Sequence, residues 1–168
     1  MIRPVRSDAP GLFRLFVYGT LKRGYWNHEA YCGSAVSVEE ATVRGHLYEL
    51  PSGIPLLEVP DGDILAVGTD DLAADMRVQE SVGAPSVSCD LPGWYTVHGE
   101  IVTFDNAALH VPPIDRLESF RPGRFSLYIR VLVSASTASE DSVAAWCYIA
   151  SPQALHTATP IREYRWPR

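Results

Sequence analysis

The sequence predicts an α+β fold in which strands dominate, arranged as a mixed sheet or a small barrel. Apolar runs rich in β-branched and aromatic residues outnumber the segments with helical character. The two kinds of segment do not alternate as regular strand–helix–strand units, which argues against a doubly wound fold. Several runs are apolar at successive positions, as expected of strands that are buried on both faces in a small barrel.

Strands are expected where these apolar runs lie between turn-forming residues. The first run ends at Gly19, and a turn at 51–53 separates the second run from the third. In chain order, the expected strands span residues 12–18, 42–50, 54–59, 64–68, 94–104, 127–134 and 143–150.

Short helices are expected between the strands. The first spans residues 25–34 and is capped near Asn27. The second spans residues 70–82 and begins with carboxylates, which the helix dipole favours at that end. A Gly/Pro/Ser-rich loop follows at 83–93. A third helix opens at Pro112-Pro113, because proline suits a first helical turn, and it carries Ile114, Leu117 and Glu118.

The length of 168 residues indicates one domain with its own core. Residues 1–11 are expected to form a loose arm, and residues 12–168 a single domain. The tail contains two large aromatic residues, Tyr164 and Trp166, and is therefore expected to dock on the domain.

Charge and composition exclude several classes of function. The net charge is −6 and no basic run could neutralise phosphates, so nucleic acid is not an expected partner. No apolar stretch reaches the ~18 residues of a membrane span, and the first residues lack the apolar core of a secretory leader. These features predict a cytoplasmic protein. Lys22 is the sole lysine, and the excess of arginine is consistent with a GC-rich bacterial coding sequence.

The cysteines do not predict a structural site. Cys32, Cys89 and Cys147 are odd in number and widely spaced, so neither a disulfide framework nor a zinc site is expected. No metal ligand set is predicted among the histidines either.

The first chemically informative segment is Phe16-Val17-Tyr18-Gly19-Thr20-Leu21-Lys22-Arg23-Gly24. A buried strand ends abruptly at Gly19, which can adopt a positive φ or let the backbone approach a ligand. The backbone N–H groups after such a turn can form a concave anion site for a carboxylate or an oxyanion. An ordinary strand-ending turn is the competing interpretation.

The second segment is Ile114-Asp115-Arg116-Leu117-Glu118-Ser119-Phe120. Asp115 and Glu118 lie three residues apart and are expected to share a helix face. Glu118 lies beside the apolar side of that helix, and burial there would raise its pKa toward the range useful for proton transfer. A solvated helical carboxylate is the competing interpretation.

The third segment contains Tyr128 and Arg130, which alternate onto the same face of a strand. A tyrosine hydroxyl there could orient a carboxylate. Alternatively, the two side chains belong to a half-exposed strand face.

Taken together, these segments resemble the γ-glutamylcyclotransferase family, in the branch of the AIG2-like proteins and γ-glutamylamine cyclotransferase. The resemblance covers roughly residues 12–150. The matching pieces follow the order of the family, and they are VYGTLKRG with a following NH, VRGHLYEL, VHGEIVTF, IDRLESF, YIRVLV and AAWCYI.

The resemblance implies a small mixed β-barrel flanked by short helices, and an enzyme of the acyl-transfer, cyclising-lyase type. In the implied reaction, the α-amine of a γ-glutamyl group attacks its own γ-carbonyl. The products are 5-oxoproline and a free amine or amino acid. The implied partner is thus a small-molecule γ-glutamyl substrate, and no metal or organic cofactor is required.

The resemblance also implies roles for individual residues. Glu118 matches the catalytic acid/base of the family. In the family, one loop binds the glutamyl part of the substrate, and the residues that match this loop are Tyr18, Gly19, Thr20 and Leu21. Tyr128 is expected beside the site. Arg130 is expected to be structural and to pair with Asp115.

The segment at about 61–93 is longer than a compact family member needs, and it is expected to be an insertion. It could act as a lid, as a wall for the substrate, or merely as a solvated extension. The loop after Glu118 carries Arg121 and Arg124, which could meet an anionic leaving group, although a solvated loop is the simpler interpretation.

Several residues compete with these assignments. Glu100 is the rival acid/base, because it follows a strand glycine and could face the barrel interior. His28 is either a proton relay or a structural histidine, and Cys32 is expected to be a buried free thiol.

Two alternatives to the general activity also stand. One is a non-catalytic binding or interaction module on the same fold. The other is a tailoring enzyme that removes a γ-glutamyl protecting group.

Overall fold

The computed structural model describes residues 11–83, 85, 92–139, 141–162 and 165–166. The strands are β1 (Phe13–Val17), β2 (Ser37–Glu49), β3 (Pro55–Glu58), β4 (Ile64–Val67), β5 (Tyr95–Phe104), β6 (Tyr128–Thr137), β7 (Ser142–Ala150) and β8 (Thr159–Pro160). The helices are α1 (Trp26–Cys32), α2 (Leu72–Val82), α3 (Ala107–Leu117) and α4 (Pro152–Leu155), with a 3₁₀ turn at Asp61–Asp63.

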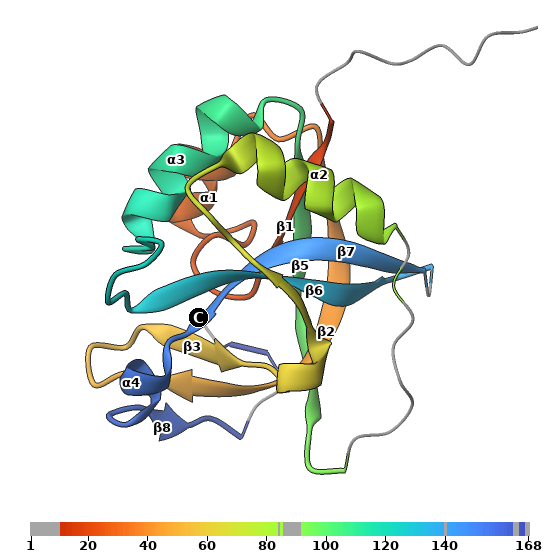
Figure 1. The fold of residues 1–168 in the computed structure, drawn as a ribbon. Coiled ribbons are helices and arrows are strands. Elements are labelled where there is room, and N and C mark those ends of the chain that lie inside the picture. The colour runs from red at the N-terminus through yellow and green to blue at the C-terminus, as the bar shows by residue number, and fades with distance from the viewer. Residues whose placement is uncertain (1–10, 84, 86–91, 140, 163–164, 167–168) are drawn as a thin grey trace, which may run out of the picture.

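Five strands close into a mixed barrel. They follow one another in the order β2-β5-β1-β7-β6, and a further pairing of β2 with β6 completes the ring. The β1–β7 pair is parallel and the other barrel pairs are antiparallel. The strands β3, β4 and β8 extend the sheet outside the ring. The predicted α+β fold with a small mixed barrel and short helices is therefore confirmed (Figure 1).

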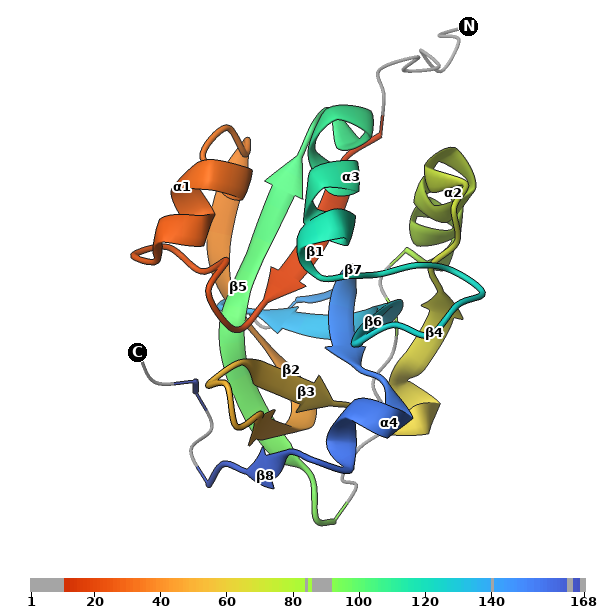
Figure 2. The ribbon, with the colours of Figure 1, turned by 90° about the vertical axis from the view of Figure 1, so that its left-hand side faces the viewer.

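Alternation along the barrel strands separates two apolar clusters, since successive side chains point to opposite faces. In β1, Phe16 contributes to the cluster inside the barrel, whereas Phe13 and Leu15 contribute to the cluster beneath the helices. Figure 2 shows α1, α2 and α3 at one end of the molecule, and α4 with β8 at the other. The helix-side cluster therefore joins α3 to the barrel strand from which the YGTL loop emerges.

The predicted start of the third helix at Pro112-Pro113 is wrong, because α3 begins earlier. Asn106 caps the helix by accepting a hydrogen bond from the Leu109 N–H at 3.3 Å. Both prolines lie inside the helix, where they leave the carbonyls of Ala108 and Leu109 without their usual partners. These two residues are exposed, so water can satisfy their carbonyls.

Two further boundaries differ from the prediction. The strand β2 starts at Ser37 rather than at residue 42, because its polar first half pairs with β5 although it shows no apolar run. The cap of α1 is Tyr25 and not Asn27, which lies inside the helix and is buried.

The segment 61–93 contributes elements that are bound to the barrel. The strand β4 pairs with β6. In α2, the buried Gln79 donates to the Leu12 carbonyl at 2.7 Å and accepts from the Arg14 N–H at 3.1 Å. That this segment is an insertion stays a prediction, and residues 84 and 86–91 of its expected loop lie outside the described residues.

The tail docks on the domain, as predicted. It forms α4, and β8 then pairs with β2. The Trp166 ring lies 5.6 Å from the Tyr25 ring, centroid to centroid. Tyr164 and residues 1–10 of the predicted arm lie outside the described residues. None of the described helices combines the length and apolar character that a membrane crossing requires.

Candidate active site

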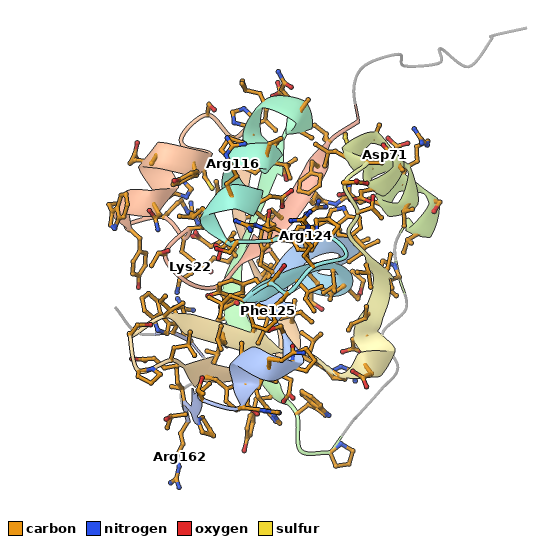
Figure 3. The ribbon with its side chains drawn as sticks, turned by 60° about the vertical axis from the view of Figure 1, so that its left-hand side comes forward. Lys22, Asp71, Arg116, Arg124, Phe125 and Arg162 are labelled. Carbon is orange, nitrogen blue, oxygen red and sulfur yellow. The ribbon has the colours of Figure 1, made fainter. Side chains whose placement is uncertain are left out.

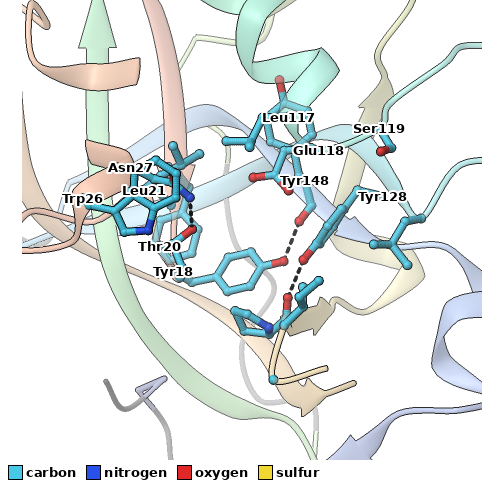
Figure 4. A pocket seen from close by; sticks show the side chains of 17 residues that line it. Tyr18, Thr20, Leu21, Trp26, Asn27, Leu117, Glu118, Ser119, Tyr128 and Tyr148 are labelled. Carbon is cyan, nitrogen blue, oxygen red and sulfur yellow. Dashed lines mark hydrogen bonds between the residues drawn. The ribbon is translucent and has the colours of Figure 1, made fainter. Parts of the chain in front are cut away.

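A pocket of about 420 Å³ opens between the end of β1, the β2–β3 turn and the end of α3. Every residue that the sequence singled out for the site lines it, namely Tyr18, Gly19, Thr20, Leu21, Glu118 and Tyr128. Figure 4 shows Thr20 and Leu21 on one side of the space, and Glu118 and Tyr128 on the other. The fold thus brings together three segments that lie far apart in the sequence, the first beginning at Tyr18 and the last containing Tyr128.

The loop from Tyr18 to Leu21 continues β1 out of the barrel. The Lys22 N–H donates to the Gly19 carbonyl at 3.1 Å and closes a tight turn. Gly19 does not have a positive φ, contrary to one of the two expectations for it. Its small size matters instead, because a Cβ here would lie 2.8 Å from Cγ of Pro55 on β3. Glycine therefore lets the loop pack tightly against β3.

The backbone N–H groups of Thr20 and Leu21 belong to residues that line the pocket. Within the described part of the chain, no group accepts a hydrogen bond from either of them. The Thr20 hydroxyl accepts from Asn27 Nδ2 at 2.8 Å, which ties the loop to α1. Such adjacent free N–H groups can bind a carboxylate or a developing oxyanion.

Two tyrosines build the floor of the pocket. The Tyr18 hydroxyl donates to the Tyr148 carbonyl at 2.7 Å, and the Tyr128 hydroxyl donates to the Pro55 carbonyl at 2.6 Å. Burial raises the pKa of both hydroxyls, and nearby groups that include the Glu118 carboxylate raise them further. Both tyrosines are therefore neutral. Because the Tyr128 hydroxyl donates to the Pro55 carbonyl, its hydrogen bond holds β3 in place rather than orienting Glu118.

Glu118 sits where α3 ends. It caps the helix, and its N–H donates to the Ile114 carbonyl at 2.9 Å. The next residue, Ser119, has a φ of 54°, a left-handed conformation that costs energy in a non-glycine residue. The chain therefore turns sharply at this point, and the Glu118 side chain faces the pocket (Figure 4).

The Glu118 carboxyl is poised to exchange a proton near neutral pH. Burial raises its pKa from 4.5 to about 7. Among the described residues, no side chain or backbone group forms a hydrogen bond with this carboxyl. A carboxyl that is half-buried, unpaired and close to neutrality in pKa can accept a proton from a ligand and return it.

Asp115 does not cooperate with Glu118 in the pocket. Its carboxylate accepts from Arg130 Nε at 3.0 Å and from the Tyr148 hydroxyl at 2.5 Å. The predicted Arg130–Asp115 pair is thus confirmed. Arg130 Nη1 also donates to Asp75 of α2 at 3.0 Å, so one buried guanidinium joins β6, α2 and the last turn of α3.

Sequence reasoning missed several residues of the pocket. Tyr148, Ile54 and Trp26 line it, and none of them belongs to a pattern that marked it in advance. Asn27 had a signal, since it follows the YGTL segment and belongs to the matching NH pair, but no role in the pocket was predicted for it. Its side chain is buried, and its Oδ1 has no hydrogen-bond partner in the described structure.

The rival residues lie elsewhere or have structural partners. Glu100 binds Arg23 at 2.8 Å and faces a different cavity. His28 Nδ1 forms a hydrogen bond of 2.8 Å with the Leu21 carbonyl and so supports the loop. Cys32 is buried, and burial raises its thiol pKa to about 12. Across the residues that the structure describes, no cluster of three His, Cys, Asp or Glu side chains could hold a metal ion.

Comparison with known families gives a match over most of the chain. The family model described as gamma-glutamyl cyclotransferase, AIG2-like, matches residues 15–73 and 66–168. These two ranges include every residue of the candidate site. A comparison with curated proteins gave no match.

Two solved structures share the fold. One is YkqA from Bacillus subtilis, with 22% identity and a TM-score of 0.54 over 92% of this chain. The present chain spans only 39% of the length of that protein. The other is an AIG2-like protein from mouse, with 20% identity and a TM-score of 0.55, covering 94% of this chain and 89% of the mouse chain. At these identities the likeness supports the fold alone.

Proposed function

The chain belongs to the gamma-glutamyl cyclotransferase, AIG2-like family, and on this premise we propose that it converts a small γ-glutamyl compound into 5-oxoproline. The other product is a free amine or amino acid. The observation that carries the proposal is the position of Glu118, whose pKa of about 7 makes it a proton carrier, in the same pocket as the free N–H groups of Thr20 and Leu21.

The reaction begins with a proton transfer. The ionised Glu118 carboxylate accepts a proton from the α-ammonium group of the substrate, which leaves a neutral amine. The amine nitrogen then attacks the γ-carbonyl carbon of the same molecule, and the new C–N bond closes a five-membered ring. Holding amine and carbonyl in contact is a proximity effect that needs no covalent enzyme intermediate.

Charge then develops on the carbonyl oxygen. In the proposal, the N–H groups of Thr20 and Leu21 donate to this oxyanion. Glu118 returns its proton to the nitrogen of the leaving amine and then accepts a second proton from the ring nitrogen, which becomes the N–H of the lactam. The bond between the leaving nitrogen and the γ-carbon breaks, and the amine takes up this second proton as it is released. Two protons of the substrate ammonium group thus end on the amine, and Glu118 is again a carboxylate.

The other predicted site residues hold the substrate and set the shape of the pocket. Tyr18 and Tyr128 are neutral, and their hydroxyls are engaged with backbone carbonyls, so we assign them to the walls that hold the glutamyl chain. Gly19 keeps the loop close to β3, which sets the width of the pocket.

The test is the identity of the product. Purified protein is incubated with γ-glutamyl amides and with their α-N-acetylated forms, and 5-oxoproline and glutamate are quantified separately. The proposal predicts 5-oxoproline from the free α-amines and no turnover of the acetylated compounds, because acylation removes the nucleophile. Release of glutamate from both forms would indicate hydrolysis by water and would refute the proposal. Binding without turnover would favour a non-catalytic module.

A further inference from the structure

Two large apolar side chains that line the candidate active site are also exposed. Trp26 lines the pocket, yet 75% of its surface is exposed, and Ile54 on the β2–β3 turn is 40% exposed. Figure 4 shows Trp26 beside Leu21 and Asn27, across the pocket from Tyr128. Large apolar side chains at the rim of a concave site commonly mark a surface that a ligand covers.

The described lining of the pocket also holds no cation. Of the residues described as lining it, none is lysine, arginine or histidine, and its one carboxyl group is Glu118. A leaving group that carries its own carboxylate would enter a pocket with a carboxylate inside and no positive charge to receive it. Like charges in such a partly desolvated space repel each other.

Three cations that are close to pocket residues in the sequence are engaged elsewhere. Lys22 Nζ donates to the Trp166 carbonyl at 3.4 Å, and Arg23 binds Glu100, both at a separate cavity. Arg130 is held by Asp75 and Asp115.

Other arginines are exposed and do not line the pocket. In the loop after Glu118 these are Arg121 and Arg124. Figure 3 labels Arg116 on α3 and Arg162 near β8, at opposite ends of the molecule, and neither lines the pocket. The pocket walls thus offer a leaving group apolar contact and no ion pair.

From this arrangement we infer that the leaving group is an uncharged apolar or aromatic amine substituent, and that Trp26 and Ile54 contact it. The inference rests on the proposed function. The glutamyl part occupies the inner pocket near Glu118, and the substituent extends outward between the indole ring and the isoleucine side chain. Amino acids and peptides are disfavoured as leaving groups, because their carboxylate finds no partner there.

Three compounds test the inference. γ-Glutamyl-phenethylamide and γ-glutamyl-phenylalanine carry the same aromatic ring and differ by one carboxylate, and γ-glutamyl-ethylamide lacks the ring. The rate of 5-oxoproline release gives kcat/KM for each. We expect the phenethylamide to exceed each of the other two by about 10-fold or more, since apolar contacts discriminate on that order.

Variants at the pocket rim test the apolar contact and the missing positive charge separately. Trp26→Ala is expected to lower kcat/KM for the phenethylamide by about 10-fold and to lower it much less for the ethylamide, which has no ring to contact the indole. Because Trp26 is mostly exposed, this variant should fold. Ile54→Lys places a cation at the mouth and is expected to raise the value for γ-glutamyl-phenylalanine relative to the phenethylamide. Leu109→Ala, an exposed apolar residue outside the pocket, is the matched control and should change none of the three values.

The outcomes distinguish this inference from the function on which it rests. If γ-glutamyl-phenylalanine is cyclised as well as the phenethylamide or better, the inference is wrong and the cyclotransferase activity stands. Equal effects of Trp26→Ala on the phenethylamide and the ethylamide would also overturn it. If none of the three compounds yields 5-oxoproline, the proposed function fails and this inference fails with it.

Discussion

Arg130 donates a hydrogen bond from Nε to Asp115 Oδ1 at 3.0 Å, and Asp115 lies three residues before Glu118. The guanidinium is buried, and it binds Asp75 of α2 through Nη1. A side chain from β6 therefore fixes the end of α3, and with it the backbone from which Glu118 reaches the pocket.

Replacing Arg130 by Met should destabilise the protein strongly. The change leaves the carboxylates of Asp75 and Asp115 without their cation, and Asp75 is buried. Removing one partner from a buried ion pair lowers the free energy of unfolding by about 3–5 kcal/mol. Urea unfolding measures this loss. The exposed Arg116→Met, on the same helix, should stay within about 0.5 kcal/mol of wild type. Equal stability of the two variants would show that the network does not hold the fold.

The pH dependence of activity should follow Glu118. A general base acts only when it is ionised, and the pKa of this carboxyl is raised from 4.5 to about 7 by burial. We therefore expect kcat/KM to fall as the pH drops below about 7, by roughly tenfold per unit well below that value. A profile recorded from pH 5 to pH 9 measures it. A value that stays flat down to pH 5 would show that a group with an ordinary carboxyl pKa, or none, acts as the base.

The same pKa makes a prediction about stability. In the folded state Glu118 holds its proton up to about pH 7, whereas in the unfolded chain it loses it near 4.5. The unfolded state therefore binds fewer protons between these values, and ionisation of Glu118 lowers the free energy of unfolding as the pH rises from 4.5 through 7.

Glu118→Gln removes the loss of stability that ionisation of Glu118 causes. The variant should melt above wild type at pH 8, and the difference should vanish well below pH 4.5, where Glu118 is protonated in both the folded and the unfolded wild type. Each kcal/mol gained raises the Tm by roughly 2–4 °C for a chain of this size. Melting curves at the two pH values measure the effect. A variant that melts below wild type at pH 8 would contradict the burial of an unpaired carboxyl.

Gly19→Ala should impair activity through the shape of the loop. The added Cβ would lie 2.8 Å from Pro55 Cγ, so the loop or β3 must shift by a few tenths of an ångström or more. Since a misplacement of about 1 Å in an active site can cost 10²-fold, we expect kcat/KM to fall by about 10–100-fold. Gly62→Ala meets no atom within 4 Å and is the matched control. Full activity of Gly19→Ala would mean that the packing against β3 does not set the pocket.

Much of the fold could be predicted from local patterns. The strands that form the barrel are rich in β-branched and aromatic residues, and each expected segment overlaps an observed strand. The exceptions have physical reasons. The first half of β2 is polar because one of its faces is exposed, and the start of α3 was misplaced because the cap at Asn106 outweighs two interior prolines.

The candidate site was predictable only in part. The sequence pointed to the YGTL loop, Glu118 and Tyr128, which line one pocket, but their roles stay predictions. Asp75 pairs with Arg130 across 55 positions of the chain, and no local pattern encodes such a partner. The same holds for Trp26 and Ile54, whose shared position at the pocket mouth depends on how β3 and α1 pack.

The central claim is that Glu118 carries the proton in a cyclisation reaction. The most direct measurement compares 5-oxoproline release by wild type, Glu118→Gln and Glu100→Gln with the same γ-glutamyl amide. Glutamine keeps the size of the side chain and removes the proton carrier, and Glu100 is a carboxylate outside the pocket. The account predicts a loss of about 10²–10⁴-fold in kcat for Glu118→Gln and little change for Glu100→Gln. Full activity of Glu118→Gln, or loss confined to Glu100→Gln, would contradict it.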